Sequence, residues 1–196
     1  MNQTETMNRP RAGVHNKIKK LAELQQVLES ARASDIKVAL CHGVFDLIHP
    51  GHIVHFQEAR KHGDIVVVTV TPDRFVNKGP GRPIFNEHLR LQNLASLETV
   101  DFVALNEWPT ATEAINLLKP HAFVKGKDYA NPEDDITGKI HEEEAAVLSV
   151  GGQLVFTDGF TSSSSHLINR FFSAYPASVQ EYLHDFRRRN SVDQII

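Results

Sequence analysis

The middle of the chain alternates between short apolar runs and segments with helical periodicity. Five runs have the length of buried strands, and 64–71 is the continuous β-branched stretch typical of a parallel strand covered on both faces. This alternation predicts an α/β domain with a five-stranded parallel sheet and right-handed helical crossovers. The predicted strands are 36–41, 64–71, 102–105, 122–125 and 153–157, and helices are predicted over 86–97, 110–118 and 140–150.

The N-terminal end lies outside this alternation. Residues 1–16 are polar and show no periodicity, so they are predicted to be disordered. Residues 17–33 have an amphipathic pattern, which predicts a helix that buries one apolar stripe on its own sheet or on a second subunit. The stripe consists of Ile18, Leu21, Leu24 and Leu28.

The C-terminal end is more polar than the middle. A serine tract at 162–165 precedes a predicted helix over 166–172, Pro176 ends it, and a last polar helix is predicted over 179–189. The expected organisation is therefore an N-terminal tail and helix, a main domain, and a C-terminal helical extension or linker. These parts cover 1–35, 36–172 and 173–196 respectively.

Composition narrows the class of protein. The chain has 196 residues, and a hydrophobic fraction of 41% is enough for a proper core. A formal charge of -3 gives no electrostatic reason to expect nucleic acid or an anionic membrane as a partner. No run of about eighteen apolar residues exists, so no membrane span is predicted. The single cysteine, Cys41, excludes an intrachain disulfide and fits a reducing cytoplasm.

The most informative stretch follows the first predicted strand. Residues 42–52 run through His42 and Gly43 to His49-Pro50-Gly51-His52, and a helical pattern begins there. Proline suits a first helical turn, and free N–H groups at a helix start bind anions, so the two histidines are placed to face an anion. Taken alone, each histidine could equally be an ordinary surface residue. The spacing of His49, His52 and His55 also allows a zinc site, although no further cysteine or carboxylate pair completes the ligands.

The combination of Gly43-Val44-Phe45-Asp46 with His49-x-Gly51-His52 resembles the opening of the cytidylyltransferase-like nucleotidyltransferases. The resemblance implies a Rossmann-like, doubly wound fold. It also implies that His49 and His52 are catalytic and contact the phosphates of a nucleoside triphosphate. Further nucleotide contacts are implied for Gly43, Val44, Phe45 and Gly51.

Two later motifs extend the resemblance. Lys125-Gly126-Lys127-Asp128-Tyr129 resembles the Lys-Gly-x-Asp-Tyr loop of the heptose-phosphate adenylyltransferases, which implies nucleotide contacts for Lys125, Gly126 and Asp128. The serine tract stands where the family carries hydroxyls at a helix start, which implies phosphate contacts for Ser163, Ser164 and Ser165. By itself, a serine tract is equally a linker that caps a helix.

Three cations match family positions between the second and third predicted strands. Lys78 lies in a loop rich in glycine and proline, and the resemblance implies a catalytic, substrate-facing lysine there. Arg82, followed by Pro83, matches the heptose subgroup and is implied to bind substrate. Arg90 matches a nucleotide-binding arginine on the next helix, although alone it reads as a surface charge.

The resemblance implies transfer of AMP from ATP to a sugar phosphate, with release of pyrophosphate and formation of an ADP-sugar. Alternatives are a cytidylyltransferase that uses CTP and glycerol phosphate, and a catalytically inactive nucleotide-binding domain. Mg²⁺ is the expected cofactor, with unknown protein ligands. A homodimer is expected, as is possible fusion or coupling to a sugar kinase, with no nucleic acid or membrane partner and a cytoplasmic location.

Overall fold

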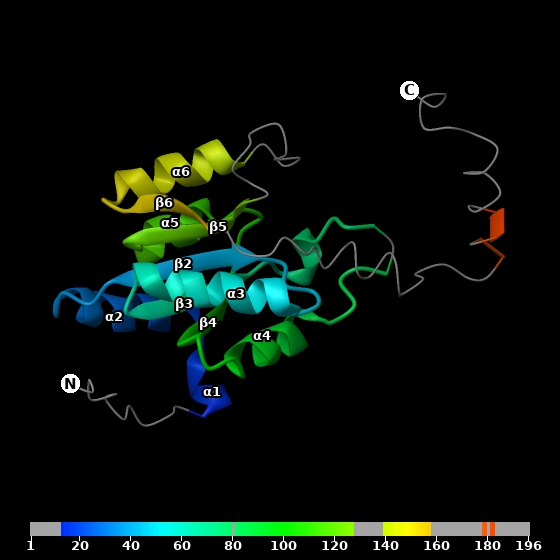
Figure 1. Ribbon diagram of the computed structural model, residues 1–196, viewed down its shortest axis with the longest axis horizontal. Helices are drawn as coiled ribbons and strands as arrows, with labels where there is room; N and C mark the ends of the chain where they lie inside the picture. The colour runs from blue at the N-terminus through cyan, green and yellow to red at the C-terminus, as the bar shows by residue number, and fades with distance from the viewer. Residues whose placement is uncertain (1–12, 80, 128–138, 158–177, 180, 183–196) are drawn as a thin grey trace, which may run out of the picture.

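The computed structural model describes residues 13–79, 81–127, 139–157, 178–179 and 181–182. Its centre is a six-stranded sheet, drawn in Figure 1 with β6 uppermost and β4 lowermost among the labelled strands. All neighbouring strands are parallel, in the order β1-β4-β3-β2-β5-β6. The strands are β1 Ile18–Lys19, β2 Val38–Gly43, β3 Ile65–Val70, β4 Phe102–Leu105, β5 Ala122–Gly126 and β6 Gln153–Thr157.

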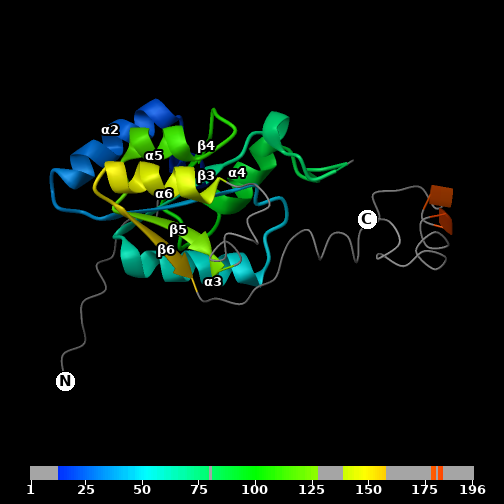
Figure 2. The ribbon, with the colours of Figure 1, turned by 90° about the horizontal axis from the view of Figure 1, so that it is seen from above.

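Helices cover both faces of the sheet, as the doubly wound prediction requires. In Figure 2, α2, α5 and α6 lie on one side and α3 on the other. Core packing places α4 with α3, because both contribute buried residues to the same hydrophobic cluster. The helices are α1 Val14–Lys17, α2 Leu21–Arg32, α3 Pro50–Ala59, α4 Glu87–Ala95, α5 Thr112–Leu118 and α6 Ile140–Ser149, with 3-10 turns η1 Arg60–His62 and η2 Asp73–Phe75.

The sheet residues alternate between two cores. Ala39 and Cys41 of β2 point to the α3 and α4 side, whereas Val38 and Leu40 point to the α2, α5 and α6 side. Every residue of β3 is buried, which explains its continuous β-branched sequence. None of the helices among the described residues is long and apolar enough to cross a membrane.

The N-terminal region corrects two sequence predictions. The stripe residues Leu21, Leu24 and Leu28 are buried on α2 as predicted, but Ile18 belongs to a strand that pairs with Val103. The sheet consequently has six strands instead of five. The helix α1, Val14–Lys17, also begins inside the region predicted to be disordered.

Long-range hydrogen bonds explain why the N-terminal region forms a short helix and a strand. The Nζ atom of Lys17 donates to the carbonyls of Leu97 and Val100 at 2.9 and 2.7 Å. These bonds hold the chain against the loop before β4, where two residues complete the sheet edge. A strand of two residues leaves the apolar spacing of a helix unchanged. The helix predicted from periodicity over 17–33 therefore included β1 together with α2.

The strand order reverses beside β2. From β2 the chain proceeds outward to β3 and β4, and it then returns to the other side of β2 to form β5 and β6. Ligands of such sheets bind at the carboxyl ends of the strands, at this switch point. Gly43 ends β2 and Gly126 ends β5, so both lie at the edge where the sequence placed its motifs.

Candidate active site

The start of α3 brings His49 and His52 to the carboxyl edge of the sheet. His49 is the N-cap in an extended conformation, and Pro50 occupies the first turn. Proline has no N–H to leave unsatisfied and is preorganised for this position. The His52 amide donates to the His49 carbonyl at 2.9 Å, which closes the turn and places both imidazoles at the helix start.

Aromatic packing fixes the histidine pair. The two rings stack with centroids 3.8 Å apart and an interplanar angle of 27°. Phe45 meets the His52 ring edge-on at 5.2 Å and also packs against Phe56, 5.4 Å away. Phe45 reaches this position from a backbone φ of 50°, in the left-handed region. The Gly43-to-Asp46 loop therefore supports the His52 ring directly.

His52 is held in its neutral form. Burial lowers its pKa from the ordinary 6.5 to about 3, and the nearby positive charges of His49, His55 and Lys78 act in the same direction. A backbone hydrogen bond involving Leu47 opposes the shift. A neutral imidazole still donates one N–H, so His52 can bind a phosphate oxygen without first taking up a proton.

A second histidine, His42, is held neutral near the end of β2. Thr69 donates its hydroxyl to the Cys41 carbonyl at 3.4 Å, so it accepts from Nδ1 of His42 at 3.0 Å. Nε2 of His42 then accepts from the Thr71 hydroxyl at 3.3 Å, an assignment that follows from the network. Burial first and the Lys125 charge second lower the pKa of His42 to about 3. This network joins the ends of β2 and β3.

Asp46 holds the loop that carries the predicted substrate residues. Its Oδ2 accepts from Nε of Arg82 at 2.6 Å, and its Oδ1 accepts from the amides of Ile84 and Phe85 at 2.7 and 3.2 Å. Both carboxylate oxygens are therefore engaged. The side chain of Arg82 is 4% exposed, and its buried Nη2 has no hydrogen-bond partner among the described residues. The guanidinium consequently keeps one buried donor, Nη2, that no described residue uses.

Arg90 is fully buried and joins several segments. Nε donates to the Phe85 carbonyl at 3.0 Å and Nη1 to the Val44 carbonyl. Nη2 donates to the Thr71 carbonyl at 2.8 Å and to Oδ1 of Asp73 at 2.7 Å. These bonds occupy four of the five donors of a guanidinium and give Arg90 a structural role at the site. Its contact with nucleotide stays a prediction.

Lys78 lies within electrostatic reach of this group. The residue as a whole is exposed, yet its pKa is lowered, first by loss of solvent around the amine and then by the charge of Arg82. Asp46 raises the pKa and Arg90 lowers it further. Because the same ammonium also acts on His52, the loop brings Lys78 toward the histidine pair.

The β5 side of the site contains a buried ion pair. Nζ of Lys125 lies 2.8 Å from Oε2 of Glu143 on α6, and both side chains are largely buried. Thr157 donates its hydroxyl to the Lys125 carbonyl at 3.3 Å and pairs with Nδ1 of His55 at 3.0 Å. These contacts tie the ends of β5 and β6 to α3, the helix that carries His49 and His52.

Sequence reasoning missed Glu143, His55 and Thr157 as supports of the site. Glu143 carried a signal, because it falls on the buried stripe of α6 with Ile140 and Val147, where a carboxylate needs a partner. The predicted ligands Asp128, Ser163, Ser164 and Ser165 lie outside the described residues, as does the helix predicted at 166–172.

The carboxylates near the site do not fit Mg²⁺. Asp46 uses both oxygens as described, and Asp73 accepts from Arg90 through Oδ1 and from the Glu87 amide through Oδ2. A group of three or more metal-binding side chains is absent from the described part of the chain. The implied Mg²⁺ would consequently depend on phosphate oxygens and water rather than on these residues.

The sheet, its switch point and the histidine-bearing helix start define a Rossmann-like α/β protein with a site at the strand carboxyl ends. Residues 40–170 match the family model described as cytidylyltransferase-like. The chain therefore belongs to the cytidylyltransferase-like family.

Similar proteins agree with this assignment. The bifunctional protein HldE of Gluconobacter oxydans is 36% identical over 78% of this chain and 31% of its own length. The HldE of Methylococcus capsulatus is 39% identical over 70% of this chain and 28% of its own. The chain thus spans about a third of the length of these relatives.

Solved structures share the architecture. A lipopolysaccharide core biosynthesis protein from Thermoplasma volcanium is 26% identical, with a TM-score of 0.53 over 64% of this chain and 99% of that chain. Pantoate-beta-alanine ligase from Francisella tularensis is 14% identical, with a TM-score of 0.55 over 84% of this chain and 75% of that one. The second likeness concerns the fold alone.

Proposed function

We propose that this chain is an adenylyltransferase that transfers AMP from ATP to a sugar phosphate and releases pyrophosphate. The observation that carries the proposal is the neutral His52 stacked on His49 at the start of α3. Family membership and the similarity to HldE proteins support the same reaction.

The reaction is a displacement at phosphorus. A phosphate oxygen of the acceptor attacks the α-phosphorus of ATP, and the bond from that phosphorus to the oxygen bridging to the β-phosphate breaks. That oxygen leaves with pyrophosphate, and the new diphosphate bond makes an ADP-sugar. Such transfers depend mainly on positioning and on compensation of spreading negative charge.

The described residues supply both requirements. His49 and His52 would donate to the α- and β-phosphate oxygens beside the N-terminus of α3. Lys78 would compensate charge as a flexible point cation, while the unused Nη2 donor of Arg82 would bind the acceptor phosphate. When present with the nucleotide, Mg²⁺ would supply further charge compensation, and none of the carboxylates described near the site would hold it.

The wider setting of the enzyme is also a proposal. The HldE relatives are bifunctional and about three times as long as the matched segment, which supports coupling to a second activity, for which we propose a sugar kinase. We further propose a homodimer located in the cytoplasm, with ATP and a small sugar phosphate as partners.

A pyrophosphate-release assay tests the proposal. The purified chain is incubated with each of four nucleoside triphosphates and a panel of sugar and polyol phosphates. We expect ATP with a sugar phosphate to give the fastest release. Faster release with CTP and glycerol phosphate would instead assign a cytidylyltransferase. ATP binding without release from any acceptor would indicate an inactive nucleotide-binding domain.

A further inference from the structure

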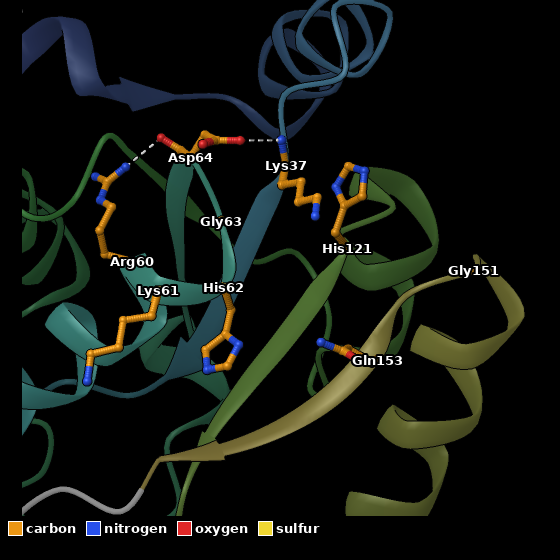
Figure 3. A pocket seen from close by; sticks show the side chains of 9 residues that line it. All are labelled: Lys37, Arg60, Lys61, His62, Gly63, Asp64, His121, Gly151 and Gln153. Carbon is orange, nitrogen blue, oxygen red and sulfur yellow. Dashed lines mark hydrogen bonds between the residues drawn. The ribbon is translucent and has the colours of Figure 1, made fainter. Parts of the chain in front are cut away.

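A second polar pocket lies at the amino ends of the strands, opposite the candidate active site. Its volume is about 370 Å³, within the range of small-molecule sites. Lys37 precedes β2, Asp64 precedes β3, His121 precedes β5, and Gln153 begins β6. Figure 3 shows these side chains together with Arg60, Lys61 and His62 of η1.

Two residues give the pocket a defined donor arrangement. The Val38 amide donates to Nδ1 of His121 at 3.0 Å, so the neutral imidazole carries its proton on Nε2. Lys37 is adjacent to Val38 in the chain, and Figure 3 shows its side chain extending to the same side as that of His121. Within the described ranges, the Lys37 amine makes no hydrogen bond or ion pair. The lining of the pocket therefore includes a cation and an imidazole N–H of defined tautomer.

The remaining lining residues differ in their availability. Arg60 is engaged, because it donates to the carbonyls of Asp64 and Thr99 and pairs with Asp101. Lys61 and His62 follow α3, where positive charge also offsets the helix dipole. The argument for a ligand therefore depends on Lys37 and His121, which come from the sheet edge. The backbone amide of Gln153 donates to the His121 carbonyl at 3.0 Å, whereas its side-chain amide makes no hydrogen bond to the described residues.

Asp64 does not neutralise this arrangement. Its Oδ2 accepts from the Lys37 amide at 2.9 Å, which directs that oxygen to the backbone. The pocket retains Lys37 and Lys61 as unpaired cations among the described residues, against this one carboxylate. A compact dianion satisfies a lysine, an imidazole N–H and an amide together better than a neutral ligand does.

We propose that this pocket binds a phosphate oxyanion, carried by a small phosphorylated molecule. The phosphoryl oxygens accept from the Lys37 amine, from Nε2 of His121 and from the Gln153 amide. The site is separate from the His49 and His52 edge, because strands of about six residues span roughly 17–20 Å. It does not depend on the adenylyltransferase proposal.

Local NMR shifts in the full chain distinguish this pocket from the active site. Inorganic phosphate is titrated while the amides of Gly63 and Gln153 and the ring of His121 are followed. We expect saturable shifts at all three with a dissociation constant in the millimolar range. A parallel titration with glycerol phosphate distinguishes free phosphate from a phosphorylated small molecule as the ligand. Tighter binding of glycerol phosphate than of inorganic phosphate supports the phosphorylated small molecule. Equal or weaker binding overturns that assignment.

Matched variants test the donors. Lys37→Met keeps the aliphatic stem, and His121→Asn keeps an acceptor for the Val38 amide while removing the Nε2 donor. Each should weaken phosphate binding about tenfold or more. Lys20→Met, at the opposite end of the protein, should leave it unchanged, and thermal unfolding verifies that all variants fold. Absence of saturation, equal shifts with chloride, or unchanged affinity in folded Lys37→Met and His121→Asn would overturn the proposal.

Discussion

Nε of Arg82 donates to Oδ2 of Asp46 at 2.6 Å, and this bond joins the loop after β2 to the loop that carries Lys78. Asp46 also accepts from two backbone amides of that loop, so a single carboxylate sets the direction of the Arg82 guanidinium. The arrangement leaves Nη2 of Arg82 without a hydrogen-bond partner among the described residues.

Asp46→Asn should impair acceptor binding more than ATP binding. An amide oxygen still accepts from the backbone, but its NH₂ group cannot accept from Arg82, so the guanidinium loses its orientation. We expect KM for the acceptor to rise about tenfold, with a smaller change in KM for ATP. Steady-state kinetics with each substrate varied separately provide the measurement. Equal changes in both constants would contradict a role through Arg82.

His52→Ala should retain the fold and lose most turnover. Removal of one donor to a developing phosphate charge typically lowers the rate on the order of 10²–10³-fold. His15→Ala, at an exposed position in α1, serves as the matched control and should keep normal kcat. Circular dichroism checks folding. A folded His52→Ala protein with nearly unchanged kcat would remove this histidine from the mechanism.

Lys78→Ala should lower kcat and kcat/KM together if the lysine acts in the transition state. A lysine that only gathers substrate would raise KM alone. The described residues of the loop between η2 and α4 form neither a helix nor a strand, which is the usual character of active-site lids. Arg74→Ala on the neighbouring turn is the control. Unchanged constants for Lys78→Ala would leave the lid assignment without support.

Arg90→Met should destabilise the fold strongly. The substitution removes the donors to three carbonyls, of which that of Thr71 is buried, and leaves Asp73 without its ion-pair partner, at a cost on the order of 3 kcal/mol. Arg74→Met makes the same chemical change on the surface and should cost at most about 1 kcal/mol. Urea unfolding gives both free energies. Similar values for the two variants would show that the Arg90 network contributes little.

The free energy of unfolding should fall as the pH drops below about 6.5. His42 and His52 have pKa values near 3 in the folded protein against 6.5 ordinarily, so below 6.5 the unfolded chain binds more protons than the native one. The contribution of these two histidines to the free energy of unfolding is therefore fully present above pH 6.5 and is lost progressively as the pH falls toward 3. Urea unfolding at pH 7.5, 6.5 and about 5.5 measures the slope. Ring resonances of either histidine titrating near 6.5 in the folded protein would contradict the prediction.

The positions of the main strands and of the histidine motif were determined by the sequence itself. The buried β3 and the strand-to-helix junction at His49 depend on apolar runs, on proline and on turn residues, which act within a few positions of the chain. The alternation of elements then fixes which strand ends meet at one edge. The prediction of an α/β fold is confirmed for these reasons, and the location of the site at that edge stays a prediction.

Only the tertiary structure decided which cationic side chains bond to the protein and which keep a donor without a partner. Arg90 bonds to Val44, 46 positions away, and Lys125 pairs with Glu143, 18 positions away, so no local pattern contains these partners. Likewise, β1 exists because Lys17 reaches carbonyls 80 and 83 residues distant. Buried cations require acceptors, and only the folded chain shows where those acceptors lie. Arg82 and Arg90 therefore look alike in the sequence, yet one keeps an open donor and the other has its guanidinium bonded to the protein.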